Sequence, residues 1–243
     1  MWYENLRSIY YIALKDMKTY YFKPPAISWG IVFPVAWILA FYLRNPRDFD
    51  ELIPGLIAMT VLFSTTAMEA VVINFELRLG SLERLLLAPV TLTSVLLGKI
   101  LGGAIFGLMI TAVVTLVSVI ALGLYDVSIL YLLLVLLPSL LLFSSLGALI
   151  CVLVREVFEA QTLANLPRFL MVFLCGIFTP ISSLPPVLKQ VAYILPLTYT
   201  VDGIRQSFGG AGDIAIASDI MVLIALIPIL ILPATRLLAR RFI

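Results

Sequence analysis

The chain has 243 residues, of which 62% are hydrophobic and only 12% are charged, and its mean hydropathy is +1.12. Soluble domains contain about 45–50% apolar and about 25% charged residues, so this composition excludes a soluble fold. The net charge of +2 is too small and too dispersed to indicate a nucleic-acid partner. Because the sequence has no histidine, metalloprotease and Ser-His-Asp chemistry are also excluded. Cys151 and Cys175 lie within apolar segments, so we expect neither a disulfide framework nor a metal site.

An amphipathic helix is predicted at the start of the chain, from Tyr3 to Phe22. Apolar residues recur there at steps of three and four, with charged residues between them. This pattern is typical of a helix that lies in the membrane interface, and Pro24 and Pro25 are expected to end it. We therefore interpret residues 1–25 as an interfacial helix and residues 26–243 as one membrane domain.

Six apolar segments of roughly spanning length follow the interfacial helix. They are Ala26–Leu43, Ile53–Ile73, Ile100–Leu122, Ile129–Val154, Leu166–Phe178 and Ile220–Leu238. The predicted fold is therefore an all-α integral membrane protein with six transmembrane helices.

The positions of the basic residues orient these six segments. All but four of the 16 Lys and Arg residues fall on one side of the predicted topology, and the exceptions are Arg44, Arg47, Lys189 and Arg205. By the positive-inside rule the basic side is cytoplasmic. We therefore expect a multi-pass protein of the cell (plasma or inner) membrane with both termini in the cytoplasm.

The apolar stretch Ile181–Leu197 is interrupted by prolines and is not predicted to be a further span. We interpret it as an extracytoplasmic re-entrant hairpin of one or two short helices before the last span. Four residues at its ends and turn are the candidates for an extracytoplasmic gate. They are Pro180, Leu184, Pro185 and Pro196.

The cytoplasmic connection between the second and third spans is predicted to hold a short amphipathic helix. Leu79, Leu82, Leu85 and Leu86 are expected to form its apolar face. Such a helix can lie against lipid or press its exposed side into a partner protein, and the pattern alone leaves both possibilities open.

This connection and the segment after the fifth span together resemble the type-2 ABC exporter permeases. The residues that carry the resemblance in the connection are Glu76, Gly80-Ser81-Leu82-Glu83, Leu85-Leu86-Leu87-Ala88-Pro89 and Gly98-Lys99, with Ser81 where the family has Thr. Those that carry it after the fifth span are Cys175-Gly176-Ile177-Phe178-Thr179-Pro180, Leu184-Pro185, Pro196-Leu197-Thr198-Tyr199, Asp202 and Arg205, with Cys175 where the family usually has Ser. The motifs span nearly the whole chain in the family's order.

The resemblance implies a permease that moves an amphipathic substrate outward, such as a lipid, a lipid-linked glycan or a hydrophobic drug. It implies two copies of a soluble ATPase subunit as partners, which bind ATP and Mg²⁺, and a second permease chain, expected to form a homodimer. Gly98-Lys99 lacks the remainder of a phosphate-binding loop, so the chain itself is not expected to be an enzyme or to hold a cofactor. The expected contacts with the ATPase are Glu76, Arg78, Gly80, Glu83, Arg84 and Pro89.

Polar and aromatic residues inside the spans are candidates for the substrate pathway. Ionisable and hydroxyl groups at membrane depth usually face protein or a water-filled cavity. The candidates are Ser64, Thr65 and Glu69 on the second span and Phe169, Phe173 and Phe178 on the fifth. Ordinary helix packing is the alternative for the aromatic residues. Helix packing is also the preferred interpretation of the glycines on the third span.

Two other functions remain open from the sequence. A secondary transporter or channel would fit the lack of a nucleotide site. An intramembrane aspartyl protease would use Asp126 and Asp213, which occur in Tyr-Asp and Gly-x-Gly-Asp contexts, but the predicted topology places both outside the membrane.

Overall fold

The structure is a computed structural model that describes residues 2–23, 32, 35–37, 39–40, 42–43, 52–87, 90–123, 126–154 and 156–240. Within these ranges it does not cover the side chains of residues 2–4, 67–71, 74, 77, 83, 86, 121–122 and 157–158. The regular elements of the described residues are all helical. The first predicted span, Ala26–Leu43, falls largely outside these residues, although the described positions within it are helical.

The remaining helices follow in chain order. They are α1 (Trp2–Asp16) with a π-turn (Met17–Tyr21), α3 (Ile53–Arg78), α4 (Ser81–Leu86), α5 (Leu92–Leu122), α6 (Ile129–Leu153), α7 (Val157–Leu174), a 3₁₀ turn (Ile181–Ser183), α8 (Pro186–Ile194), α9 (Pro196–Ser207) and α10 (Ile216–Ala239).

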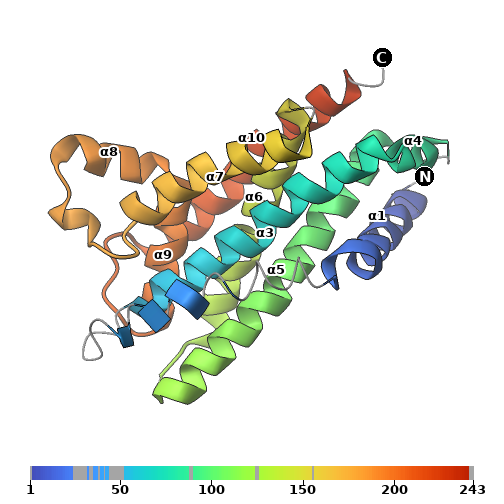
Figure 1. Ribbon diagram of the computed structural model, residues 1–243. Coiled ribbons are helices and arrows are strands. Elements are labelled where there is room, and N and C mark those ends of the chain that lie inside the picture. Colours follow the sequence, from blue (N-terminus) through green and yellow to red (C-terminus); the bar gives the residue numbers. More distant parts are fainter. Residues whose placement is uncertain are drawn as a thin grey trace.

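The long helices α3, α5, α6, α7 and α10 run side by side along one bundle (Figure 1). Both chain termini and α4 lie toward one end of this bundle, whereas α8 and α9 lie toward the other end (Figure 1). Because both termini lie at the same end of the bundle, the chain is expected to cross the membrane an even number of times. The count of six stays a prediction, because the first expected span is largely outside the described residues.

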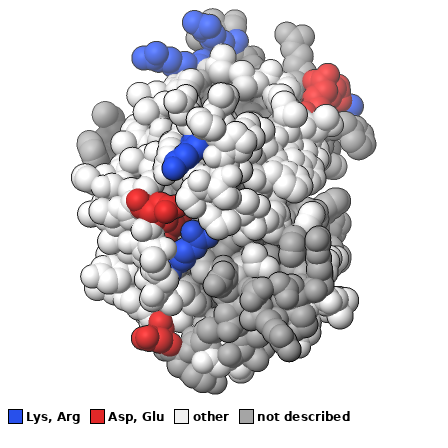
Figure 2. Space-filling model, turned by 90° about the vertical axis from the view of Figure 1, so that its left-hand side faces the viewer, with Lys and Arg blue, Asp and Glu red and all other residues white. Residues whose placement is uncertain are grey.

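The helices bury an apolar core and leave apolar side chains on the outside as well. Leu56 on α3, Phe143 on α6 and Leu197 on α9 are among the fully buried residues of the main core. Leu116 on α5 and Ile224 on α10 are instead well exposed. The face of the molecule on the α8 side is largely uncharged, with a few scattered charged side chains (Figure 2). Exposed apolar side chains such as Leu116 and Ile224 suit contact with lipid.

Three described helices are long and apolar enough to cross a membrane. These segments are Leu92–Ile120, Ile129–Leu153 and Ile216–Ala239, and Ile53–Thr66 is a shorter apolar helix. Membrane embedding is therefore supported by the structure as well as by composition.

Several helix boundaries differ from the sequence prediction. Helix α5 begins at Leu92 rather than Ile100, because the Thr91 hydroxyl accepts a hydrogen bond from the Ser94 backbone N–H (3.2 Å) and caps the helix. Helix α7 begins at Val157 rather than Leu166. Helix α9 was not predicted at all, although Pro196 at its first position is a common helix start.

The predicted helix at the start of the chain is confirmed as α1. It does not only lie at the surface, because one side of it packs against α5. A Cβ atom at Gly98 of α5 would lie 2.8 Å from Ile12 Cβ and 3.0 Å from the Ile9 carbonyl oxygen. A Cβ atom at Gly102 would lie 3.5 Å from Ala13. The glycines of α5 therefore allow α1 to approach closely, as expected of small residues at helix contacts.

Replacing Gly98 with Ile should detach α1 from α5. Overpacking of a close helix contact costs about 1–3 kcal/mol, so the variant should unfold at a lower temperature in detergent. The control is Ala112→Leu, which adds bulk to the exposed side of the same helix. Equal unfolding temperatures for Gly98→Ile and Ala112→Leu would contradict this packing.

Candidate functional site at the α3 to α5 connection

The connection between α3 and α5 is a tight turn followed by the short helix α4. Gly80 adopts a left-handed conformation (φ 64°) between the two helices, which residues with a side chain rarely adopt. The Ser81 hydroxyl donates to the Glu76 carbonyl oxygen (3.3 Å), and Leu82 is buried against Ile73 and Val95. Helix α4 is therefore held close to the ends of both α3 and α5.

The predicted apolar face of α4 is only partly confirmed. Leu82 is buried and Leu85 is half-buried, but Leu79 precedes the helix and is 62% exposed. The side chain of Leu86 lies outside the described part of the chain.

A buried cluster of four charged residues lies beside this connection. The Lys99 ammonium on α5 donates to Glu76 Oε2 on α3 (2.5 Å) and to Asp16 Oδ2 on α1 (3.1 Å). Lys15 also forms ion pairs with Glu76 and with Asp16. Asp16, Glu76 and Lys99 are almost completely buried, whereas Lys15 is partly exposed. The four-charge cluster, Lys15, Asp16, Glu76 and Lys99, therefore ties three helices together.

This cluster changes the interpretation of Glu76. The sequence placed its carboxylate among the contacts with the ATPase subunit, but in the structure it is buried and faces two lysines of its own chain. Burial raises the pKa of Asp16, and the nearby Lys99 ammonium opposes that increase. The cluster was not predicted, because its members come from three helices that are far apart in the chain.

The surface beside α4 carries exposed charged residues. Arg78 at the end of α3 forms an ion pair with Glu156 (3.1 Å), so the connection from α6 to α7 lies next to α4. Arg84 is exposed on α4, and Leu87 after it is 87% exposed. Of the other predicted contacts, Pro89 and the side chain of Glu83 lie outside the described residues.

A hollow of about 460 Å³ separates α1 from the region of α4. Arg7, Tyr11 and Lys15 of α1 line one side, and Leu85 and Val90 line the other. The Arg7 guanidinium lies 5.5 Å from the centre of the Tyr11 ring, within the range of a cation–π contact. Of the two cations among the described lining residues, Lys15 is already paired with Glu76 and Asp16, so Arg7 is the one that an acidic group would meet in the hollow.

The predicted polar stripe on α3 does not line either of the two cavities described for this chain. Ser64 and Thr65 are buried, and both hydroxyls donate to the Val61 carbonyl oxygen of their own helix (3.3 and 2.8 Å). A Cβ atom at Gly107 of α5 would clash with Thr65. The stripe therefore packs α3 against α5, and the side chain of Glu69 lies outside the described part of the chain.

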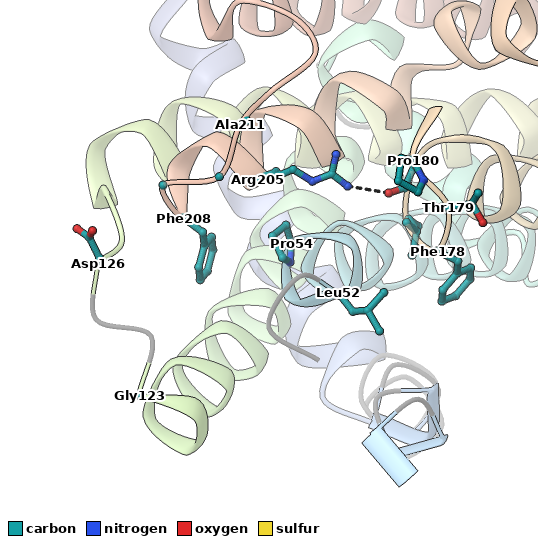
Figure 3. Close-up of a pocket in the computed structure, with 14 residues that line it drawn as sticks. Leu52, Pro54, Gly123, Asp126, Phe178, Thr179, Pro180, Arg205, Phe208 and Ala211 are labelled. Atoms are coloured by element: carbon teal, nitrogen blue, oxygen red, sulfur yellow. Dashed lines mark hydrogen bonds between the residues drawn. The ribbon is translucent and has the colours of Figure 1, made fainter. Parts of the chain in front are cut away.

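The aromatic pathway candidates fall into two groups. Phe169 and Phe173 are exposed on the outer side of α7. Phe178 is half-buried, and its ring centre lies 5.5 Å from that of Trp37. Phe178 also lines the larger cavity, at the end of the bundle opposite α4 (Figure 3).

A buried arginine on α7 was not selected from the sequence. Arg168 Nε donates to the Thr66 hydroxyl (2.5 Å) and Nη1 donates to Asn165 Oδ1 (2.8 Å). Its guanidinium also lies 5.6 Å from the centre of the Phe63 ring. Arg168 therefore joins α7 to α3 through a buried positive charge.

The predicted gate residues lie where the hairpin turns. Pro180 precedes the 3₁₀ turn, Leu184 ends it, Pro185 caps α8 and Pro196 starts α9. The Tyr199 hydroxyl donates to the Tyr193 carbonyl oxygen (2.6 Å) and links α9 to α8. The 3₁₀ turn and α8 agree with the one or two short helices predicted within Ile181–Leu197, whereas re-entry into the membrane stays a prediction.

Asp202 and Arg205 on α9 have separate partners. Asp202 accepts hydrogen bonds from the backbone N–H groups of Asp213 (2.8 Å) and Ile214 (3.1 Å), and thus folds the α9 to α10 loop onto α9. Arg205 Nη2 donates to the Gly176 carbonyl oxygen (2.9 Å), just after α7. Asp202 therefore holds the α9 to α10 loop against α9, and Arg205 holds the segment after α7 against α9.

Comparison with known proteins identifies the family. Residues 7–208 match the family described as "ABC-2 type transporter". The chain is 30% identical over 199 residues to the "Probable multidrug ABC transporter permease YbhS" of Escherichia coli K12, covering 79% of this chain and 52% of that protein. It is 26% identical over 208 residues to the "Inner membrane transport permease YadH" of the same strain, covering 84% of this chain and 81% of that protein. The chain thus spans about half the length of YbhS. It belongs to the ABC-2 type transporter family.

Proposed function

We propose that this chain is the membrane-spanning subunit of an ATP-driven exporter, driven through α4 by a separate soluble ATPase. The observation that carries the proposal is the position of α4, directly between α3 and α5, in a chain that belongs to the ABC-2 family. Two ATPase subunits bind ATP and Mg²⁺, and this chain supplies the pathway as one of two identical permease chains. Its termini and α4 face the cytoplasm of a cell that carries the protein in its plasma or inner membrane.

The surface around α4 has the features of a docking site for such a partner. Arg84 and Leu87 are exposed there, and the hollow between α1 and α4 is lined by Arg7 and Lys15. Opposite charges on a partner would orient it on this surface. We infer that the ATPase presents acidic side chains to α4 and to this hollow.

The four-charge cluster holds α1, α3 and α5 together next to this surface. A push on α4 reaches α3 through the short turn at Gly80 and reaches α5 through the segment that starts at Val90. Because Lys99 joins α5 to both Glu76 of α3 and Asp16 of α1, the three helices move together. We therefore infer that Glu76 and Lys99 are positioning residues for coupling, not contacts with the ATPase.

The proposed cargo is an amphipathic molecule. The exposed aromatic side chains of Phe169 and Phe173 suit an apolar molecule or the second permease chain. The name of YbhS refers to multidrug transport, which favours a hydrophobic drug over a lipid or a lipid-linked glycan as the cargo of this chain. The family assignment argues against a protease or a secondary transporter. Asp126 lies between α5 and α6 and Asp213 between α9 and α10, and both side chains are exposed.

Orientation is tested with single cysteines at Arg84 and Ser183. The natural cysteines, Cys151 and Cys175, are both buried, so their background reaction should be small. A membrane-impermeant maleimide added to intact cells should label Ser183→Cys and leave Arg84→Cys unlabelled until the membrane is opened. The opposite pattern would reverse the proposed topology.

Coupling is tested by reversing one exposed charge on α4. Arg84→Glu should weaken docking of an acidic partner and lower both substrate-stimulated ATPase activity and transport by the purified complex by about tenfold. Arg240→Glu is the control, since it reverses an exposed charge near the C-terminus. If the Arg84→Glu complex transports substrate at the wild-type rate and its ATPase activity is still stimulated by substrate, α4 has no part in the mechanism.

The four-charge cluster is tested with a single and a double variant. Lys99→Met leaves two buried carboxylates with one lysine and should cost about 3–5 kcal/mol of stability. Adding Glu76→Gln leaves Lys15 paired with Asp16 and should recover much of that loss. The measurement is thermal unfolding in detergent, together with ATP-driven transport, which should stay impaired in the stable double variant. Full transport by the double variant would show that the cluster serves stability alone.

A further inference from the structure

Two buried carboxyl groups meet where the start of α10 packs against α9. Asp219 lies in the first turn of α10 and is completely buried, and Asp202 on α9 is 4% exposed. The two carboxyl groups contact each other. Arg205, the nearest basic residue in the sequence, donates to the Gly176 carbonyl oxygen instead. In the part of the chain that the structure describes, neither carboxyl group has an ion-pair partner.

The acceptors around this pair outnumber the hydrogen atoms that their neighbours supply. Gln206 Nε2 lies within hydrogen-bond distance of Asp202 Oδ2 (2.8 Å), the Ile214 carbonyl oxygen (2.7 Å) and Asp219 Oδ2 (3.3 Å). An amide NH₂ group has only two hydrogens, and the two shorter bonds use both of them. Asp219 Oδ1 has no hydrogen-bond donor among the described residues. The carboxyl group of Asp219 is therefore the one that lacks a hydrogen.

The described elements around Asp219 bring no positive charge to it. Helix α6, which packs against α10, has no charged residue, and the only one on α5 is Lys99, in the four-charge cluster at the opposite end. Tyr199 of α9 lies near Asp219, but its hydroxyl donates to a backbone carbonyl of α8. Asp213 of the α9 to α10 loop is exposed and adds a further negative charge. Two adjacent buried carboxyl groups without a cation cannot both be ionised.

We propose that Asp202 and Asp219 hold one proton between them, which Asp219 donates in a hydrogen bond to Asp202. The proton supplies the hydrogen that the Gln206 amide cannot. One negative charge remains on Asp202, where the backbone N–H groups of Asp213 (2.8 Å) and Ile214 (3.1 Å) stabilise it. A metal cation does not suit this site, because Gln206 directs N–H donors and not its carbonyl oxygen at both carboxyl groups.

The shared proton attaches α10 and the α9 to α10 loop to α9. Without it, two buried negative charges would repel each other across the contact between α9 and α10. The same loop supplies Gly209, Gly210 and Ala211 to the wall of the cavity of about 680 Å³, so loss of the proton would also loosen that wall. This proton site goes beyond the proposed export function and does not depend on an ATPase, so its test can fail while the proposed function stands.

The test compares equilibrium unfolding of the wild type and Asp219→Asn in detergent between about pH 5 and pH 7. A carboxyl group in the unfolded chain loses its proton near about pH 4, whereas the folded pair keeps one. The folded state then binds one proton more than the unfolded state, so its stability falls as the pH rises. The unfolding equilibrium constant of the wild type should rise about tenfold per pH unit relative to that of Asp219→Asn, whose amide donates to Asp202 without a titratable proton.

Asp213→Asn is the matched control, because it removes an exposed carboxyl group whose backbone N–H, and not its side chain, bonds to Asp202. This variant should follow the wild-type pH profile. A second measurement does not depend on unfolding: the infrared spectrum of the folded wild type at neutral pH should contain the C=O band of a protonated carboxyl group, and Asp219→Asn should lack it.

Parallel pH profiles for the wild type and Asp219→Asn would overturn the proposal, as would infrared spectra in which both proteins have the same carboxyl band. A wild-type stability that follows the sodium concentration and not the pH would also overturn it, since a cation would then occupy the pair.

Discussion

Buried charge at the α4 end of the bundle constrains the arrangement of α1, α3 and α5. A carboxylate or an ammonium group that is removed from water is stable only when oppositely charged groups stay close to it. Lys99 of α5 meets this requirement by contacting both Glu76 of α3 and Asp16 of α1, and Lys15 completes the balance. If any of the three helices moved away, at least one buried charge would lose its partner. The position of α4, which joins α3 to α5, depends on the same contacts.

The two ends of the bundle are built differently. At the α4 end, ion pairs and the glycines of α5 fix helices closely together. At the opposite end, single hydrogen bonds from Arg205 and Asp202 fasten connections between helices, and a large cavity remains among them. A rigid end suits the transfer of force from a partner, whereas an end with a cavity suits binding of small molecules. This difference is what the proposed docking of a partner at the α4 end requires.

Much of the fold could be predicted from the sequence, because long apolar segments and helix-ending residues act locally. Gly80 indicated the turn before α4, and the prolines of the hairpin indicated short helices, as the structure shows. The predicted span began at Ile100, whereas α5 begins at Leu92 and its first turns contain the polar residues Ser94 and Lys99. Both residues are buried in the structure by contacts with other elements or a capping residue.

The functional residues were harder to predict because their partners are distant in sequence. Glu76 appeared to be a surface charge, yet it pairs with residues 61 and 23 positions away. Ser64 and Thr65 appeared to line a pathway, yet their hydroxyls bond to their own helix. Arg168 was counted only among the basic residues of the predicted cytoplasmic side, and its contact with Thr66 joins positions 102 residues apart. Tertiary contacts of this kind leave no periodic pattern in a single sequence.

A photoreactive amino acid at position 84 tests most directly whether a soluble ATPase docks on α4, as proposed. In cells that make the native partners, illumination should join this chain to a soluble ATPase subunit. The same amino acid at position 183, at the opposite end of the bundle, should give no such product. An ATPase adduct from position 183 alone, or none from position 84 while the complex still purifies intact, would contradict the account.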